Sequence, residues 1–326
     1  MIRIRYVVLL CLFALHVGAA PPSAHPPAIS EPPSWAYPVT PPDFKPTPDN
    51  GAIQKVPDSG ASYTLSQLDD EFLAPDWHPG DHPKMPGIVA HGRKPDVFAC
   101  GYCHRADGPG GPENASIAGL PYAYIVQQMS DYKSGKRSTA LPQRIPQSWM
   151  MRLAKAVTQE EIKEAARYFS SLKPRQNIRV VETNRVPKTY VANWFLAVQA
   201  GNETELLGDR IVETPENLEQ FESRDARAKF VAYVPTGSIS KGAAIVAGGK
   251  VGKAQACANC HGKNFQGQSA APPIAGRSPS YVVRQLYEIQ TGVRAGKAVA
   301  PMKDLVARLS LDDMISVAAY LASLKP

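Results

Sequence analysis

The chain has 326 residues, enough for two or three domains that each bury a core of their own. A hydrophobic content of 44% is ordinary and excludes a bundle of membrane helices. The net charge of +7 would suit a nucleic-acid partner, but the export predicted below argues against one.

The first residues have the pattern of a secretory signal peptide. Arg3 and Arg5 precede an apolar run from Tyr6 to Val17, and small residues follow it. The run is shorter than the roughly 20 apolar residues that span a bilayer. We therefore predict a cleaved signal at 1–20, no membrane span afterwards and a periplasmic location. An uncleaved anchor is the alternative.

Residues 21–60 form a proline-dense arm, a composition that favours extended polyproline conformations over packed structure. Trp35 and Tyr37 could pin this arm to the surface of a domain. A solvated tether is the alternative.

Two copies of a motif with two cysteines and a histidine follow, CGYCH at 100–104 and CANCH at 257–261. A shift of 157 residues superposes them and also aligns flanking residues. The shift pairs Tyr124, Gln128, Gly135 and Arg137 with Tyr281, Gln285, Gly292 and Arg294. Further on the shift is 152, pairing Met150 with Met302 and SLKP at 171–174 with SLKP at 323–326. The chain therefore contains duplicated domains, predicted at 61–174 and 237–326.

Both duplicated domains are predicted to be mainly α-helical. Thr158 with Glu161, and Ser310 with Asp313, form capping-box patterns that begin a C-terminal amphipathic helix in each. An earlier helix in each copy is predicted to stop at a glycine, Gly135 or Gly292.

Residues 175–236, between the copies, contain β-branched and aromatic runs separated by polar turns. We predict a small antiparallel β module that connects the two domains. A docking surface for a partner is the alternative role.

The repeated motif carries the chemistry. On the first turn of a helix, cysteines three residues apart share one face, and the histidine that follows can turn inward. Two such thiols can bind the vinyl groups of haem while the imidazole binds its iron, so C-x-x-C-H indicates a c-type haem. We predict two covalent haems, on Cys100, Cys103 and His104 and on Cys257, Cys260 and His261. A thioredoxin-like thiol pair and a zinc site made from both pairs are the alternatives.

A methionine sulfur is predicted to be the second axial ligand of each iron. The repeat selects Met150 and Met302, with Met151 as a near alternative. Met129 pairs with a leucine and Met314 lies on an apolar helix face, so both are assigned to core packing.

Both copies resemble class I cytochrome c domains, and the tandem resembles the two-domain dihaem cytochromes c of bacterial periplasms. The resemblance implies a small helical fold around each haem, His104 and His261 as proximal ligands, and Met150 and Met302 as distal ones. In this family a proline carbonyl accepts the ring N–H of the proximal histidine. Pro272 matches that position, whereas the first copy has Ala115.

Four further residues are predicted to lie near the haems or their propionates. They are the residues that the repeat pairs, Tyr124, Tyr281, Arg137 and Arg294. Packing and capping of helices is their alternative role.

The segment 76–92 contains His78, His82, Met85 and His91, which could bind copper or replace a haem ligand. Its prolines instead favour a surface loop with solvated histidines.

The predicted function is electron transfer between a redox donor, a dehydrogenase or a quinol-oxidising respiratory complex, and a terminal acceptor. Iron with histidine and methionine on its two faces has no open position for a substrate, so no catalytic residue is predicted. The alternative is a dihaem peroxidase or a thiosulfate-oxidising enzyme. A purely structural protein is disfavoured because covalent haem serves no packing need.

Overall fold

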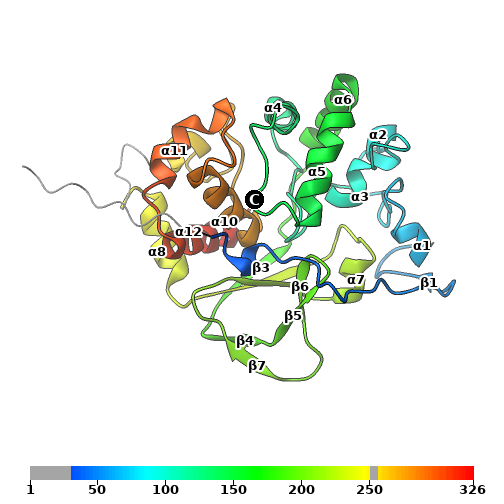
Figure 1. The fold of residues 1–326 in the computed structure, drawn as a ribbon, viewed down its shortest axis with the longest axis horizontal. Coiled ribbons are helices and arrows are strands. Elements are labelled where there is room, and N and C mark those ends of the chain that lie inside the picture. The colour runs from blue at the N-terminus through cyan, green and yellow to red at the C-terminus, as the bar shows by residue number, and fades with distance from the viewer. Residues whose placement is uncertain (1–30, 250–255) are drawn as a thin grey trace, which may run out of the picture.

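The computed structural model describes residues 31–249 and 256–326. The predicted signal peptide and the start of the proline-dense arm lie outside the described residues. Figure 1 shows two groups of helices side by side, with the strands below them and the blue arm crossing between. No helix in the described ranges is both long and apolar enough to cross a bilayer.

The first unit of helices contains the CGYCH motif. Its elements are α2 (Gly87–Ala90), α3 (Cys100–His104), α4 (Tyr122–Lys133), α5 (Ile145–Ala156) and α6 (Gln159–Ser171). The capping box predicted at the start of α6 is present, because Thr158 and Glu161 bond each other's backbone N–H groups. Beyond α4 the chain turns at Gly135, whose φ of +73° favours glycine.

The second unit of helices contains the CANCH motif. Its elements are α8 (Ser238–Val246), α9 (Ala258–His261), α10 (Pro279–Gln290), the 3-10 helix η3 (Lys297–Val299), α11 (Ala300–Val306) and α12 (Leu311–Ser323). Ser310 and Asp313 form the predicted capping box of α12. Helix α8 packs along α12, and Met314 lies fully buried in this core as predicted.

The two units repeat each other in backbone detail. The N–H of Gly119 donates to Phe169 O at 2.9 Å, and the N–H of Gly276 donates to Leu321 O at 2.8 Å. Both glycines have positive φ, and a Cβ on Gly276 would lie 2.8 Å from the ring of Pro326. This close approach requires glycine at a position that the two copies share.

The residues between the units form a small mixed β module. Its elements are β3 (Ile178–Glu182), β4 (Arg185–Pro187), β5 (Thr189–Ala192), β6 (Phe195–Val198), β7 (Thr204–Leu206), β8 (Val212–Pro215), α7 (Leu218–Glu222) and β9 (Phe230–Val234). The prediction of a purely antiparallel module is wrong, because β3 pairs with β9 in parallel. Between β3 and β9 the chain forms the antiparallel pair β4–β7, with the hairpin β5–β6 inserted between its strands, and then β8 and α7. This length of chain gives the long crossover that a parallel pair needs. Strand β8 pairs with β9 antiparallel.

The β module shares a hydrophobic core with the second unit. Val180, Ile211 and Val234 pack with the residues of α10 and α12. The module is therefore fixed to that unit by burial of apolar surface rather than tethered to it.

The arm and the segment after it wrap across the molecule. Their elements are η1 (Ser34–Ala36), β1 (Ile53–Gln54), β2 (Tyr63–Thr64) and α1 (Leu65–Leu68). Tyr37 is 1% exposed, and its hydroxyl lies 3.4 Å from both the Arg284 carbonyl and a Glu288 carboxylate oxygen on α10. The arm is thus pinned at Tyr37, as one of the two sequence hypotheses proposed.

Candidate functional site

Each repeated motif lies on a short helix that ends in the same way. Helix α3 carries Cys100, Cys103 and His104, and α9 begins after Cys257 and ends at His261. The residue after each histidine, Arg105 or Gly262, has positive φ, which turns the chain away from the helix. Both motifs therefore place two thiols and an imidazole on one helical turn.

The imidazole of each motif is held by a backbone carbonyl. Nδ1 of His104 lies 2.9 Å from Ala115 O, and Nδ1 of His261 lies 2.8 Å from Pro272 O. The first copy keeps this contact although alanine replaces proline. Burial lowers the pKa of both histidines, which favours the neutral imidazole that binds metals. With Nδ1 engaged, Nε2 is the nitrogen left to act as a ligand.

The four motif cysteines are free thiols rather than disulfides. Burial raises the pKa of Cys100 to about 12 and of Cys103 to about 11. A thioredoxin-like pair needs the opposite shift, because the reactive form is the thiolate. The structure therefore gives this alternative no support.

The zinc alternative requires both thiol pairs to meet. Over residues 31–249 and 256–326, no group of three or more His, Cys, Asp or Glu side chains is arranged to hold a metal ion. The two pairs stay in their own units.

Half-buried apolar side chains surround each motif. These side chains pack against the core of their unit but remain partly exposed, and the repeat matches them between the units: Cys100, Ile117 and Leu153 in the first, and Cys257, Ile274 and Leu305 in the second. A flat apolar ring would cover surface of this kind. The residues present therefore fit a haem attached to each motif.

The predicted methionine ligands lie on helices rather than in loops. Met150 is half-buried on α5, and Met302 is half-buried on α11, where it packs against the core that also contacts Cys257. Met151 is also half-buried on α5. Met129 packs against the core of the first unit, as predicted.

Arg137 is buried between the two units and contacts both of them. Its guanidinium donates to Gln128 Oε1 at 2.8 Å within the first unit. It also donates to Gln285 Oε1 at 2.9 Å and to the Tyr281 hydroxyl at 3.1 Å in the second. The predicted pocket residues Arg137 and Tyr281 therefore connect the two units.

Arg294 makes the equivalent contacts with the roles of the two units exchanged. It donates to Gln285 Oε1 at 3.0 Å, to Gln128 Oε1 at 2.9 Å and to the Tyr124 hydroxyl at 2.8 Å. Burial alone would raise the pKa of Tyr124, but Arg294 and Arg137 together lower it. The two arginines also face each other across an antiparallel backbone bridge. We call these six residues the arginine–glutamine network: Tyr124, Gln128, Arg137, Tyr281, Gln285 and Arg294.

The arginine–glutamine network retains donors that nothing in the described chain accepts. Nε of Arg137 and Nε of Arg294 are buried without a hydrogen-bond partner. Buried guanidinium groups normally use such donors, so a carboxylate such as a haem propionate fits this environment. The sequence repeat paired all six residues, but it gave no sign that each arginine contacts the opposite unit.

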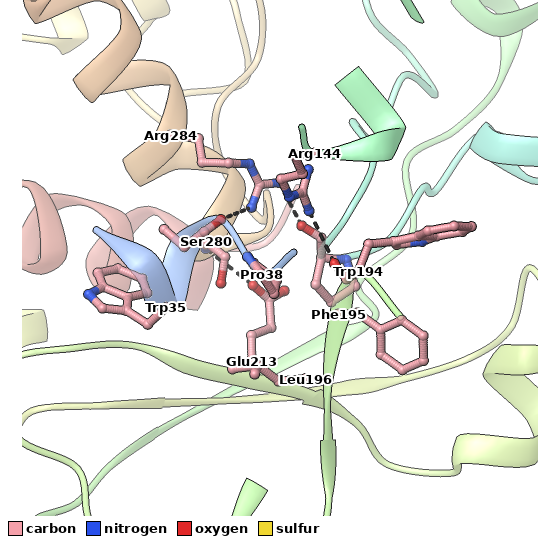
Figure 2. Close-up of a pocket in the computed structure, with 11 residues that line it drawn as sticks. Trp35, Pro38, Arg144, Trp194, Phe195, Leu196, Glu213, Ser280 and Arg284 are labelled. Carbon is pink, nitrogen blue, oxygen red and sulfur yellow. Dashed lines mark hydrogen bonds between the residues drawn. The ribbon is translucent and has the colours of Figure 1, made fainter. Parts of the chain in front are cut away.

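A second set of buried arginines, missed from the sequence, joins the remaining parts of the chain. Arg284 donates to Ala36 O of the arm at 2.8 Å and to Pro112 O of the first unit at 2.6 Å. Arg144 donates to Trp194 O of the β module at 3.3 Å. Figure 2 shows the two guanidinium groups next to each other beside a small pocket. These contacts are structural, because each arginine binds backbone carbonyls of a different segment.

The histidine-rich loop differs from its prediction. His78 is 7% exposed, and its Nε2 lies 3.1 Å from a carboxylate oxygen of Asp225. His82 lies 3.2 Å from Asp76, whose hydrogen bond raises its pKa. The prediction of solvated histidines is therefore wrong for these two, although His91 is exposed. Contacts with Asp225 and Tyr168 explain the burial, since they come from distant parts of the chain.

Comparison with known proteins agrees with this geometry. The sequence model of the cytochrome c family matches residues 245–325. Cytochrome c-554(547) of Halothiobacillus neapolitanus is 34% identical over 87 residues, which are 24% of this chain and 96% of that protein. The chain therefore belongs to the cytochrome c family.

Longer matches cover about 70% of the chain at lower identity. Cytochrome c4 of Pseudomonas aeruginosa is 24% identical over 230 residues, 69% of this chain and 83% of that protein. A thiosulfate dehydrogenase electron acceptor of Thiomonas intermedia is 23% identical over 232 residues, 70% and 80% of the two chains. These relatives confirm the predicted role as a haem-containing electron carrier.

One solved structure has a similar fold. The thiosulfate dehydrogenase TsdBA from Marichromatium purpuratum superposes with a TM-score of 0.50 at 25% identity. The match covers 73% of this chain and 39% of that chain. The present chain thus corresponds to less than half of that protein.

Proposed function

We propose that this chain is a periplasmic dihaem electron carrier built from two cytochrome c domains, at 61–174 and 237–326. In this proposal one haem is bound by Cys100, Cys103 and His104, and the other by Cys257, Cys260 and His261. Met150 and Met302 would supply the methionine sulfur ligand of each iron.

The observation that carries the proposal is the duplicated geometry of the motif. In both units two free thiols and a carbonyl-bound imidazole share one helical turn, with Nδ1 to carbonyl distances of 2.9 and 2.8 Å. The carbonyl fixes the ring orientation and tautomer, as the partners of metal-bound histidines usually do. A single motif in this state would support one haem only.

The chain's side chains also account for electron transfer rather than catalysis. Haem supplies a one-electron iron couple when it is bound. His104 and Met150 would hold one haem iron and His261 and Met302 the other, which would leave no position for a substrate, and thioether ligation suits a carrier. The buried arginine–glutamine network holds the two units in a fixed relation, with unused N–H donors for carboxylates.

A periplasmic donor and acceptor complete the proposal. The donor is a dehydrogenase or a quinol-oxidising complex. Because one relative is named as the electron acceptor of a thiosulfate dehydrogenase, an enzyme of that class is a candidate donor.

The enzymatic alternative, a dihaem peroxidase or thiosulfate-oxidising enzyme, is not favoured. The relatives matched over most of their length are named as cytochromes and as an electron acceptor. The four cysteines of the described chain all belong to the two motifs, which leaves none for an unusual iron ligand.

The test is the haem content and spectrum of the secreted protein. We expect an intact mass with two covalent haems, a weak sulfur-to-iron band in the oxidised form and low peroxidase turnover. A mass without covalent haem would refute the proposal. A high-spin ferric signal from one haem would instead support the enzyme.

A further inference from the structure

The two motif helices differ sharply in exposure. In the first unit Gly101, Tyr102 and every residue of 105–113 are buried. In the second unit Asn259 and Cys260 of α9 are exposed, as are Lys263, Asn264 and Gln266 after it. The motif helix is therefore covered in the first unit and exposed in the second.

Residues 68–77 cover one side of α3. A Cβ on Gly101 would lie 2.7 Å from the Cβ of Ala74, so the segment touches the helix backbone. The N–H of Ala74 donates to Ala90 O, and the N–H of Ala99 donates to Glu71 O, both at 2.8 Å. These backbone bonds fix the segment to the first unit.

Residues 218–227 of the β module cover the Tyr102 side chain of α3. The Arg224 guanidinium lies 3.7 Å from the centre of the Tyr102 ring and donates to the Tyr102 hydroxyl at 2.6 Å. Its Nε donates to Leu68 O at 2.7 Å, which ties the two covering segments together. Trp77 Nε1 adds a bond of 2.7 Å to Ser223 O. We call residues 68–77 and 218–227 the cover.

The surface around the open motif helix is basic. Residues 256–278 contain no Asp or Glu, and their exposed charge is Lys263. Exposed Lys325 lies near the segment that follows α9, because Gln266 Nε2 donates to the carbonyl oxygen of Pro326, the next residue, at 3.4 Å. Near Met302, the exposed charges of Lys303 and Asp304 offset each other, so the positive charge of the α9 face comes from Lys263 and Lys325. An acidic protein surface complements this face and would be steered toward it.

We propose that redox partners dock through an acidic surface on the α9 face of the second unit, and that the cover closes the equivalent α3 face to them. This inference rests on the proposed electron-carrier function and assigns its partner surface. A transient redox contact needs only a small interface, which a single exposed helix and its flanking lysines can provide.

Labelling of matched tyrosines tests the cover. Asn259→Tyr places a tyrosine at the position equivalent to Tyr102, and tetranitromethane nitrates accessible tyrosines in the haem-loaded protein. We expect nitration at 259 to be at least tenfold faster than at Tyr102, and Arg224→Ala to accelerate only Tyr102. Arg185→Ala, an exposed arginine of β4, is the matched control. Equal nitration of the two positions in the protein with Arg224 intact would overturn the inference, whether or not the Arg224 variant folds.

Cross-linking tests the docking face. The haem-loaded protein is mixed with poly-L-glutamate and a zero-length carbodiimide, and mass spectrometry maps the lysines joined to it. We expect Lys263 to react at least fivefold more than Lys94, which is exposed beside the cover. Lys263→Glu should weaken retention of poly-glutamate at least fivefold, and Lys94→Glu less than twofold. Equal effects at the two lysines would overturn the inference. Absence of covalent haem from the starting protein would refute the proposed function instead.

Discussion

The two units use one local design in two environments. Each has a motif helix, a carbonyl-bound imidazole and a C-terminal helix with a capping box. The motif helix of the first unit is enclosed by residues 68–77 and by the β module, whereas the motif helix of the second is exposed. The comparison shows that two copies can keep the same motif geometry while long-range contacts make one motif buried and leave the other exposed.

The largest expected effect separates the two sites. The double change Cys100→Ser and Cys103→Ser should remove one covalent haem and leave the other, because each unit holds its own thiols. Intact-mass measurement would show a loss of one haem equivalent, and the matched change at Cys257 and Cys260 should give the same loss. Loss of both haems from either variant would contradict two independent sites.

The two methionines of the second unit should respond in opposite ways. Met314→Ala removes a fully buried side chain, so the free energy of unfolding should fall by roughly 2–5 kcal/mol with an unchanged absorption spectrum. Met302→Ala should change the spectrum and lower the reduction potential with a smaller loss of stability. Denaturant titration and redox titration measure the two quantities. An unaltered Met302→Ala spectrum would exclude it as a ligand.

The arginine–glutamine network should be equally sensitive from both sides. Arg137→Ala and Arg294→Ala each remove three charged hydrogen bonds, so each should lower the free energy of unfolding by roughly 2–4 kcal/mol. The double variant should lose less than the sum, because the two arginines share Gln128 and Gln285. Strongly unequal single effects would show that the contacts are not energetically symmetric.

The smallest effect concerns pH and the cover. The hydrogen bond from Arg227, with the charge of Arg175, holds the pKa of Asp81 at about 2, below its ordinary value of 3.8. The stabilisation is therefore complete above pH 4 and is lost as the pH falls through 2. Because Asp81 is partly exposed, Asp81→Asn should cost about 1 kcal/mol or less at neutral pH. The difference from wild type should shrink between pH 4 and pH 2 in thermal unfolding, and a constant difference would exclude this origin.

Features encoded locally were predictable from the sequence. The capping boxes at Thr158 and Ser310 and the turns at Gly135 and Gly292 depend on residues a few positions apart. The duplication aligned the two motifs for the same reason. These sequence patterns occur in both copies because both need the same local backbone conformation at these positions.

Features that depend on distant contacts were not predictable. Arg224 and Tyr102 are separated by 122 positions, and Arg294 and Tyr124 by 170. No periodicity or spacing indicates that such residues meet. The parallel pairing of β3 with β9 and the burial of His78 were missed for the same reason, since both depend on how separate segments pack.

The cross-pairing of Arg137 and Arg294 has a consequence for the units taken singly. Arg137 contacts Gln285, the counterpart of its own neighbour Gln128, and Arg294 contacts Gln128 in the same way. Such a reciprocal surface is isologous, the kind that builds symmetric homodimers. A single unit expressed alone would present half of such a surface. Its arginine, glutamine and tyrosine side chains would lack their partners from the other unit. Fusion of two units in one chain supplies that second half at a fixed effective concentration.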